Sequence, residues 1–68
     1  MKKFISQPYQ LAQNKKWIPA GTITELIGNS LSVNITEIEM SENEFETKAE
    51  ADKFFADYYI QRGFIESK

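Results

Sequence analysis

The hydrophobic pattern of the chain changes near residue 47. Before this point apolar and polar residues alternate in short runs, and after it apolar residues recur three or four positions apart. Alternation with a period of two is typical of strands with one buried face, whereas the second spacing is typical of an amphipathic helix. The sequence therefore predicts a β-sheet followed by one α-helix.

The predicted helix has signals for its start and its end. Thr47 and Glu50 form a capping box, in which each side chain can bond the backbone N–H of the other residue. Gly63 suits the left-handed residue that follows a helix, and the aromatic residue after it can pack back on the last turn, as in a Schellman motif. These signals predict a helix over residues 48–62. Its core-facing stripe is predicted to contain Ala51, Phe54, Phe55, Tyr58 and Arg62.

The clearest alternation of the first part covers residues 31–36. A turn signal at residues 28–30 precedes it, and the β-branched segment 22–27 precedes the turn, so the two segments are predicted to form a hairpin. Earlier strands are predicted at residues 9–11 and 17–18. Short links between the strands favour antiparallel pairing, because parallel pairs need a crossover of about a dozen residues or more.

One irregularity interrupts the alternation. After Ile35 the apolar positions shift by one residue, to Ile38 and Met40. Such a shift predicts a β-bulge, or a strand that ends and restarts. The expected fold is α+β, a small antiparallel β-meander of three or four strands with one C-terminal α-helix packed on one face. Its core is predicted to contain Trp17, Ile23, Leu31, Val33, Ile35, Phe54, Phe55 and Tyr58.

Length and composition indicate a single small domain over residues 1–68. Hydrophobic residues make up 41% of the chain, which is too many for a disordered protein, and we find no linker or repeat. No apolar run approaches the roughly 20 residues that cross a membrane. Residues 1–5 resemble the start of a signal peptide, but the polar residues and proline at 6–8 interrupt the apolar run. We therefore expect a cytoplasmic protein.

The chain offers few residues for catalysis. It contains no cysteine and no histidine, which removes thiolate chemistry, imidazole metal ligands and a proton shuttle near neutral pH. A serine or threonine nucleophile would therefore lack its usual activating base. The three glycines are too far apart to form a phosphate-binding loop, and the acidic segment lacks the order of a calcium-binding loop. We expect no enzymatic activity, no catalytic residue, no cofactor and no metal site.

Charge is divided unevenly along the chain. Residues 1–24 contain four lysines and no acidic residue, whereas all ten acidic residues follow, several of them nearly alternating over residues 37–46. An acidic run is usually a solvated surface. It can also meet a basic partner or the lysine-rich region of another copy.

The remaining hypothesis is a protein-interaction module. Outward sheet positions are predicted to be rich in threonine and uncharged, which leaves that face free to contact a protein partner or a second copy of the chain. The candidate interaction residues are Thr22, Thr24, Ser32, Asn34, Thr36 and, on the helix, Ile60. The alternative is a nucleic-acid-binding accessory protein, in which Lys15 and Lys16 contact phosphates and Trp17 stacks on bases. The low isoelectric point, near 5.0, argues against this alternative.

Overall fold

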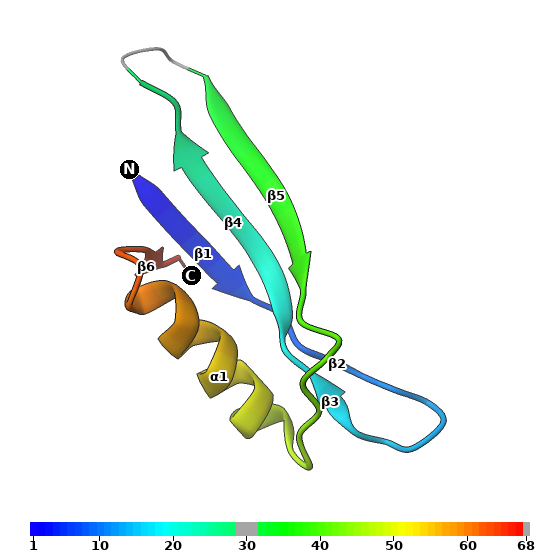
Figure 1. Cartoon of the computed structure of the whole chain (residues 1–68). Coiled ribbons are helices and arrows are strands. Elements are labelled where there is room, and N and C mark those ends of the chain that lie inside the picture. The colour runs from blue at the N-terminus through cyan, green and yellow to red at the C-terminus, as the bar shows by residue number, and fades with distance from the viewer. Residues whose placement is uncertain (29–31, 68) are drawn as a thin grey trace.

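The computed structural model describes residues 1–28 and 32–67, which form a mixed β-sheet with one α-helix against one of its faces (Figure 1). The four-stranded sheet has the order β5-β4-β1-β6, and a separate two-stranded sheet pairs β2 with β3. The elements are β1 (Lys2–Ser6), β2 (Tyr9–Gln10), β3 (Trp17–Ile18), β4 (Ala20–Leu26), β5 (Val33–Glu39), α1 (Lys48–Ile60) and β6 (Ile65–Glu66). The predicted α+β class with a C-terminal helix is confirmed.

The connectivity of the sheet differs from a simple meander in two respects. The first strand, β1, lies in the middle of the sheet, where it pairs antiparallel with β4 and parallel with the last strand, β6. The sequence suggested no strand at residues 2–6, yet this segment places Phe4 in the core. The parallel pair is possible because almost the whole chain, including α1, provides the crossover between β1 and β6.

The core is an aromatic cluster between α1 and the sheet. Phe4, Ile23, Phe55, Tyr59 and Phe64 are buried together, and the ring centroids of Phe55 and Tyr59 are 4.9 Å apart. Tilted rings at this separation stabilise each other beyond the apolar area they bury. Ile23 and Phe55 therefore hold the core positions predicted for them.

The buried face of α1 is rotated from the predicted stripe. Its buried residues are Ala51, Phe55 and Tyr59, which follow one another at intervals of four. Phe54 and Tyr58 are 37% and 38% exposed, so the prediction that they lead the core is wrong. Their rings pack at the margin of the helix instead, Phe54 on Phe45 and Tyr58 beneath the Arg62 guanidinium.

The helix begins at Lys48 as predicted but ends at Ile60, two residues before the predicted end, and the capping signals predicted at both ends are present. Thr47 Oγ1 accepts a hydrogen bond from the Glu50 amide at 3.2 Å, and its hydroxyl donates to the Glu50 carboxylate at 2.9 Å. At the other end Gly63 has φ +87°, and the amide of Phe64 bonds the carbonyl of Tyr59 at 3.0 Å. The Phe64 and Tyr59 rings also meet, with centroids 5.0 Å apart, which is the predicted Schellman arrangement.

Strand β5 contains no bulge. All seven of its residues pair in unbroken register with β4, so the shift in the apolar pattern is a change of face. Val33 and Ile35 point away from α1 and are 50% and 63% exposed, and the prediction that they belong to the core is wrong. Ile38 and Met40 pack partly against the core instead. Trp17 is only half-buried, and Leu31 lies outside the described residues.

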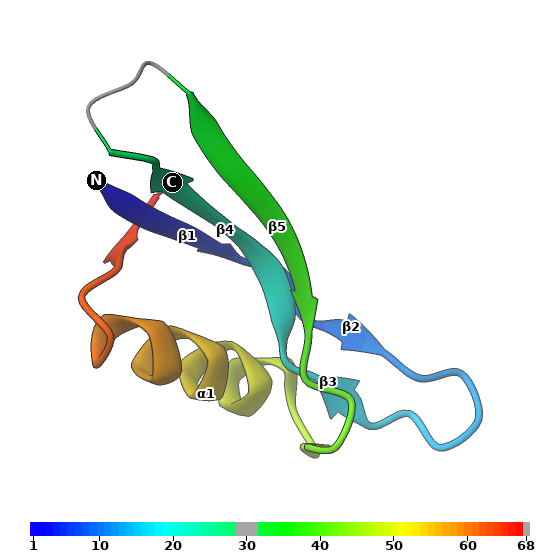
Figure 2. The same cartoon turned by 45° about the horizontal axis from the view of Figure 1, so that its top comes forward.

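The molecule is elongated, with extents of 45 × 20 × 19 Å. Its radius of gyration of 13.0 Å exceeds the value of about 11 Å expected for a compact chain of this length. Figure 2 shows the reason, because the hairpin of β4 and β5 extends beyond one end of α1 and the hairpin of β2 and β3 extends beyond the other. The helix therefore covers only part of one side of the sheet.

Candidate interaction surface

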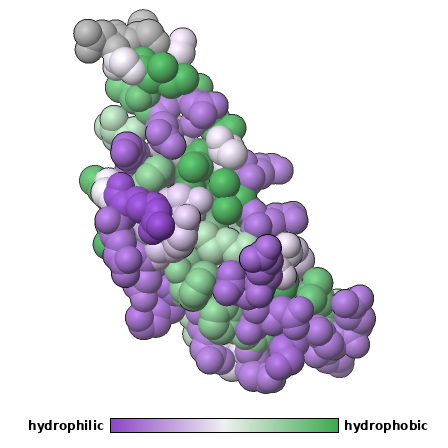
Figure 3. Space-filling model, viewed as in Figure 1, coloured by the Kyte–Doolittle hydropathy of each residue, from purple (hydrophilic) through white to green (hydrophobic). Residues whose placement is uncertain are grey.

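The sheet face that points away from α1, here called the open face, carries exposed apolar side chains. Because Thr24 pairs with both Lys3 and Ile35, and Lys3 pairs with Ile65, these residues form one row across the face. Figure 3, which is viewed from the side of α1, shows apolar surface along the upper part of the β4–β5 hairpin, beyond the end of the helix. The exposed apolar residues of the open face are Ile5, Leu26, Val33, Ile35 and Ile65.

The residues predicted to form one interaction surface are divided between different faces. Thr22 and Thr24 lie on the open face, as predicted. Thr36 pairs with the buried residue Ile23, so Thr36 and Asn34 point to the helix side of the sheet. The prediction that these four residues share a surface is therefore wrong, because the two β5 residues lie on the opposite face of the sheet from the two β4 threonines.

Two further predicted residues lie outside the strands. Ser32 is exposed directly before β5. Ile60 is 54% exposed on α1 and does not belong to the open face. The apolar residues that do form this face were missed, because alternation shows which residues share a side but not which side the helix covers.

Among the described strands β5 lies at the edge of the sheet, so one row of its backbone groups has no partner strand there. At one end of its ladder the amide of Ile27 bonds the carbonyl of Ser32 at 3.3 Å. At the other end the amide of Met40 bonds the carbonyl of Pro19 at 2.9 Å. Hydrogen-bonded pairs alternate along an antiparallel ladder, so the even-numbered residues bond β4. The N–H and C=O groups that point to the free edge belong to Val33, Ile35, Glu37 and Glu39.

A groove of about 360 Å³ lies between the end of β5, the following turn and α1. Its apolar walls are Ile38 and Met40 from the β5 side and Phe54 and Tyr58 from the helix. The carboxylates that line it belong to Glu39 and Glu42. A second depression, near Ser6 and the start of α1, is larger at about 600 Å³ but is lined mainly by polar side chains. The first groove is therefore the better site for an apolar side chain.

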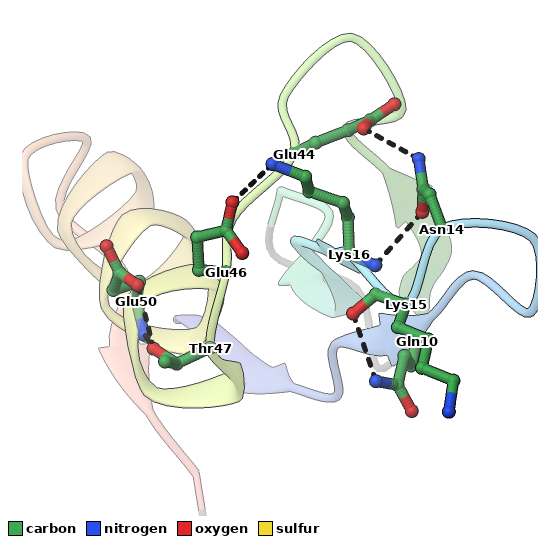
Figure 4. Close-up of polar contacts among 8 residues, drawn as sticks. All are labelled: Gln10, Asn14, Lys15, Lys16, Glu44, Glu46, Thr47 and Glu50. Carbon is green, nitrogen blue, oxygen red and sulfur yellow. Dashed lines mark hydrogen bonds and ion pairs between the residues drawn. The ribbon is translucent and has the colours of Figure 1, made fainter.

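Part of the acidic segment is used within the chain (Figure 4). Lys16 forms an ion pair with Glu46, and the hydrogen bond and charge of this carboxylate raise the pKa of the Lys16 ammonium. The side-chain amide of Asn14 donates to Glu44 at 3.2 Å. These contacts join the loop between β2 and β3 to the segment before α1. The acidic residues of β5 and the turn after it are exposed, namely Glu37, Glu39 and Glu42.

The three residues of the nucleic-acid alternative do not form an unopposed basic surface. Lys16 lies beside Glu46, and the half-buried Trp17 pairs through its backbone with Phe45 at 2.7 and 2.9 Å. Lys15 has φ +59°, and its carbonyl accepts a hydrogen bond from the Gln10 side chain. A carboxylate therefore lies next to Lys16, one of the two lysines that would contact phosphates.

The described part of the chain contains no group of three or more acidic side chains close enough to hold a metal ion. No helix among residues 1–28 and 32–67 is long and apolar enough to cross a membrane. Searches of protein-family models, curated proteins and solved structures find no match to this chain.

Proposed function

We propose that this protein is a non-enzymatic protein-binding module of the cytoplasm, which contacts a protein partner or a second copy of itself through the open face and the adjoining β5 edge. One observation carries the proposal. Among the described residues eight hydrophobic residues are buried, whereas ten large hydrophobic residues are exposed, and five of these ten lie on the open face. Exposed apolar surface of this kind marks interaction sites in small proteins.

The size of the domain supports the same proposal. In a domain of fewer than about 70–80 residues, a single hydrophobic core rarely supplies more than about 3–5 kcal/mol of stability. Each Å² of apolar surface removed from water adds about 25 cal/mol. A partner that covers the open face would therefore contribute binding free energy without any change in the core. The free edge beside this face adds backbone groups that a partner strand can satisfy.

The proposal is tested with the tagged wild-type protein and the double variant Val33→Thr/Ile35→Thr. Each of the two tagged proteins is immobilised and incubated with lysate of the source cells at low and at high salt. The mass of each purified protein in solution is also measured. We expect a protein to be retained by the wild type at both salts and lost from the double variant, or a wild-type dimer that the double variant converts to a monomer. A wild-type protein that is monomeric and retains no protein contradicts the proposal.

Ile60→Thr is the matched control, because Ile60 is a similarly exposed isoleucine on a different surface. If only this variant fails to bind the partner, the interface lies on α1 and not on the open face. Nucleic acid retained at low salt and lost at high salt would instead support the alternative through Lys15, Lys16 and Trp17.

A further inference from the structure

We propose that the β5 edge binds an extended, basic segment of a partner protein as an additional antiparallel strand. This inference rests on the proposed function and specifies its partner. Three features of the structure carry it: the free backbone groups of β5, the division of β5 into an apolar and an acidic half, and the groove between β5 and α1.

The backbone of β5 can hold a full strand. Four alternate residues over the range 33–39 direct their N–H and C=O groups to the free edge. A segment of seven residues is long enough to pair with all four of them. In an antiparallel pair each of these residues exchanges two hydrogen bonds with the residue opposite. Main-chain bonds of this kind provide affinity in strand addition, and the side chains on either side provide specificity.

On the open face the incoming strand meets two kinds of side chain. Residues opposite Val33 and Ile35 lie beside exposed apolar groups, which favours β-branched apolar residues there. Residues opposite Glu37 and Glu39 lie beside exposed carboxylates, which favours lysine or arginine. Because the partner runs antiparallel, its basic residues come first in its sequence and its apolar residues follow.

On the helix side the incoming strand lies above the groove. Helix α1 packs mainly against β1, β4 and β6, so β5 extends past it and leaves the groove uncovered. The side chain opposite Ile38 points to this side and can enter between Met40, Phe54 and Tyr58. A groove of about 360 Å³ accommodates one aromatic or large aliphatic side chain. Glu42 at its wall adds a further negative charge near the basic residues of the partner.

The charges of β5 favour such a segment over a second copy of the same strand. If two copies of β5 paired along their full length, the two-fold axis would pass through Thr36. Glu37 of each copy would then lie opposite Ile35 of the other copy, and Glu39 opposite Val33, so no carboxylate would meet an opposite charge. The two Glu37 carboxylates would be diagonal neighbours across the seam, which is repulsive. A basic segment replaces this repulsion with opposite-charge pairs.

The inference predicts a specific ligand, the peptide Lys-Phe-Lys-Thr-Val-Thr-Val. Its first residue lies opposite Glu39 and its last opposite Val33, so the phenylalanine is opposite Ile38. Binding is measured by fluorescence anisotropy of the labelled peptide and by amide chemical shifts of the protein. We expect saturable binding with the largest shifts over residues 33–39.

Two methylated peptides test whether the ligand binds as a strand. The N–H groups of the first, third, fifth and seventh peptide residues point to β5, and the others point away. Methylation of the third and fifth amides removes two hydrogen bonds and is expected to weaken binding by about tenfold or more. Methylation of the second and fourth amides is expected to change binding by less than about twofold. Equal binding of both methylated peptides would overturn the inference.

Charge variants test which carboxylates the peptide contacts. Glu37→Gln/Glu39→Gln is expected to weaken binding several-fold at low salt and to reduce its salt dependence. Glu66→Gln, which removes an exposed carboxylate at the opposite edge of the sheet, is the matched control and is expected to leave binding unchanged. A peptide whose lysines are replaced by glutamate should not bind.

The inference and the proposed function can fail separately. If the peptide does not bind but Val33→Thr/Ile35→Thr still abolishes association with a protein, the strand-addition inference is wrong and the proposed function stands. If the protein is a dimer whose β5 amides are protected from exchange and the peptide does not compete, a second copy occupies the edge and the inference is also wrong. If the peptide does not bind and the wild-type protein associates with nothing, both fail.

Discussion

The ring of Phe55 lies against the backbone of Gly21 with no room for a side chain between them. A Cβ atom placed on Gly21 would be 2.8 Å from Cζ of Phe55 and 2.1 Å from the carbonyl oxygen of Ile5. Both distances are shorter than van der Waals contact. The close approach of α1 to the sheet therefore depends on glycine at this position of β4.

The first prediction is that Gly21→Ala strongly destabilises the protein. The added methyl group forces either the helix or β1 to move, which we expect to lower the free energy of unfolding by about 3 kcal/mol. Chemical denaturation measures this loss. Gly28→Ala is the control, since no atom lies within 4 Å of the new Cβ and only the strain of φ +58° remains, at about 1 kcal/mol. Equal losses in the two variants would show that the Phe55 contact does not limit the packing.

The Schellman end of α1 gives a second prediction. Gly63 has φ +87°, which a residue with a Cβ atom adopts only with strain, and open space surrounds it. We expect Gly63→Ala to lower the free energy of unfolding by about 1 kcal/mol. Gly63→Asn should lose less, because asparagine tolerates this conformation better. An unchanged melting temperature in Gly63→Ala would contradict the assignment of Gly63 as the residue after the helix.

The two faces of the sheet give a third prediction. Ile23 is buried under α1, whereas Ile35 is exposed on the open face. Ile23→Thr places an unpaired hydroxyl and a smaller side chain in the core, and we expect a loss of about 3 kcal/mol. Ile35→Thr should change the free energy of unfolding by less than about 0.5 kcal/mol. A large loss of unfolding free energy in Ile35→Thr alone would show that Ile35 belongs to the core and would contradict its placement on the open face.

These faces also show how far the sequence could predict the fold. The helix was predictable because Thr47, Glu50 and Gly63 are local signals, and each acts within one turn of the residue that it caps. The position of β1 was not, because a short apolar segment gains its place in the middle of the sheet only through pairing with residues 15 or more positions away. Such long-range pairs leave no periodicity to detect.

The candidate site was less predictable than the fold. Alternation grouped Val33 with Ile35 correctly, but the side they occupy depends on where α1 ends relative to β5. The apolar residues of β5 change face between Ile35 and Ile38 because the helix lies below only one end of the hairpin. A β-bulge produces a one-residue shift of the apolar positions. A regular strand whose apolar residues change from one face to the other produces the same shift, so the sequence does not distinguish the two.

The contacts of Lys16 give a fourth prediction, which concerns the nucleic-acid alternative. The carboxylate of Glu46 offsets the charge of Lys16, and Trp17 is held in its backbone pair with Phe45. We therefore expect single-stranded oligonucleotides to leave the fluorescence of Trp17 unchanged at physiological salt. Glu46→Gln is the informative variant, because it removes the opposing charge. A saturable fluorescence change in the wild type that weakens with salt would contradict this prediction.

The last prediction concerns the stability of the protein at high pH. Burial raises the pKa of the Tyr59 phenol above its ordinary value of 10.0, and the neighbouring Tyr58 adds in the same direction. Above about pH 10 the unfolded chain therefore releases this proton before the folded protein does, so the free energy of unfolding falls as the pH rises. Below pH 10 both states keep the proton, and Tyr59 contributes no pH dependence.

Denaturation at a series of pH values between neutral pH and the far side of this transition measures the effect. We expect Tyr59→Phe to be less sensitive to the rise in pH than the wild type, because the phenol that titrates differently in the two states is gone. Tyr9→Phe, in the hairpin outside the aromatic core, is the control for the loss of one tyrosine. If Tyr59→Phe and the wild type lose stability in parallel above pH 10, the Tyr59 hydroxyl is accessible to water in the folded protein, and burial does not raise its pKa as described.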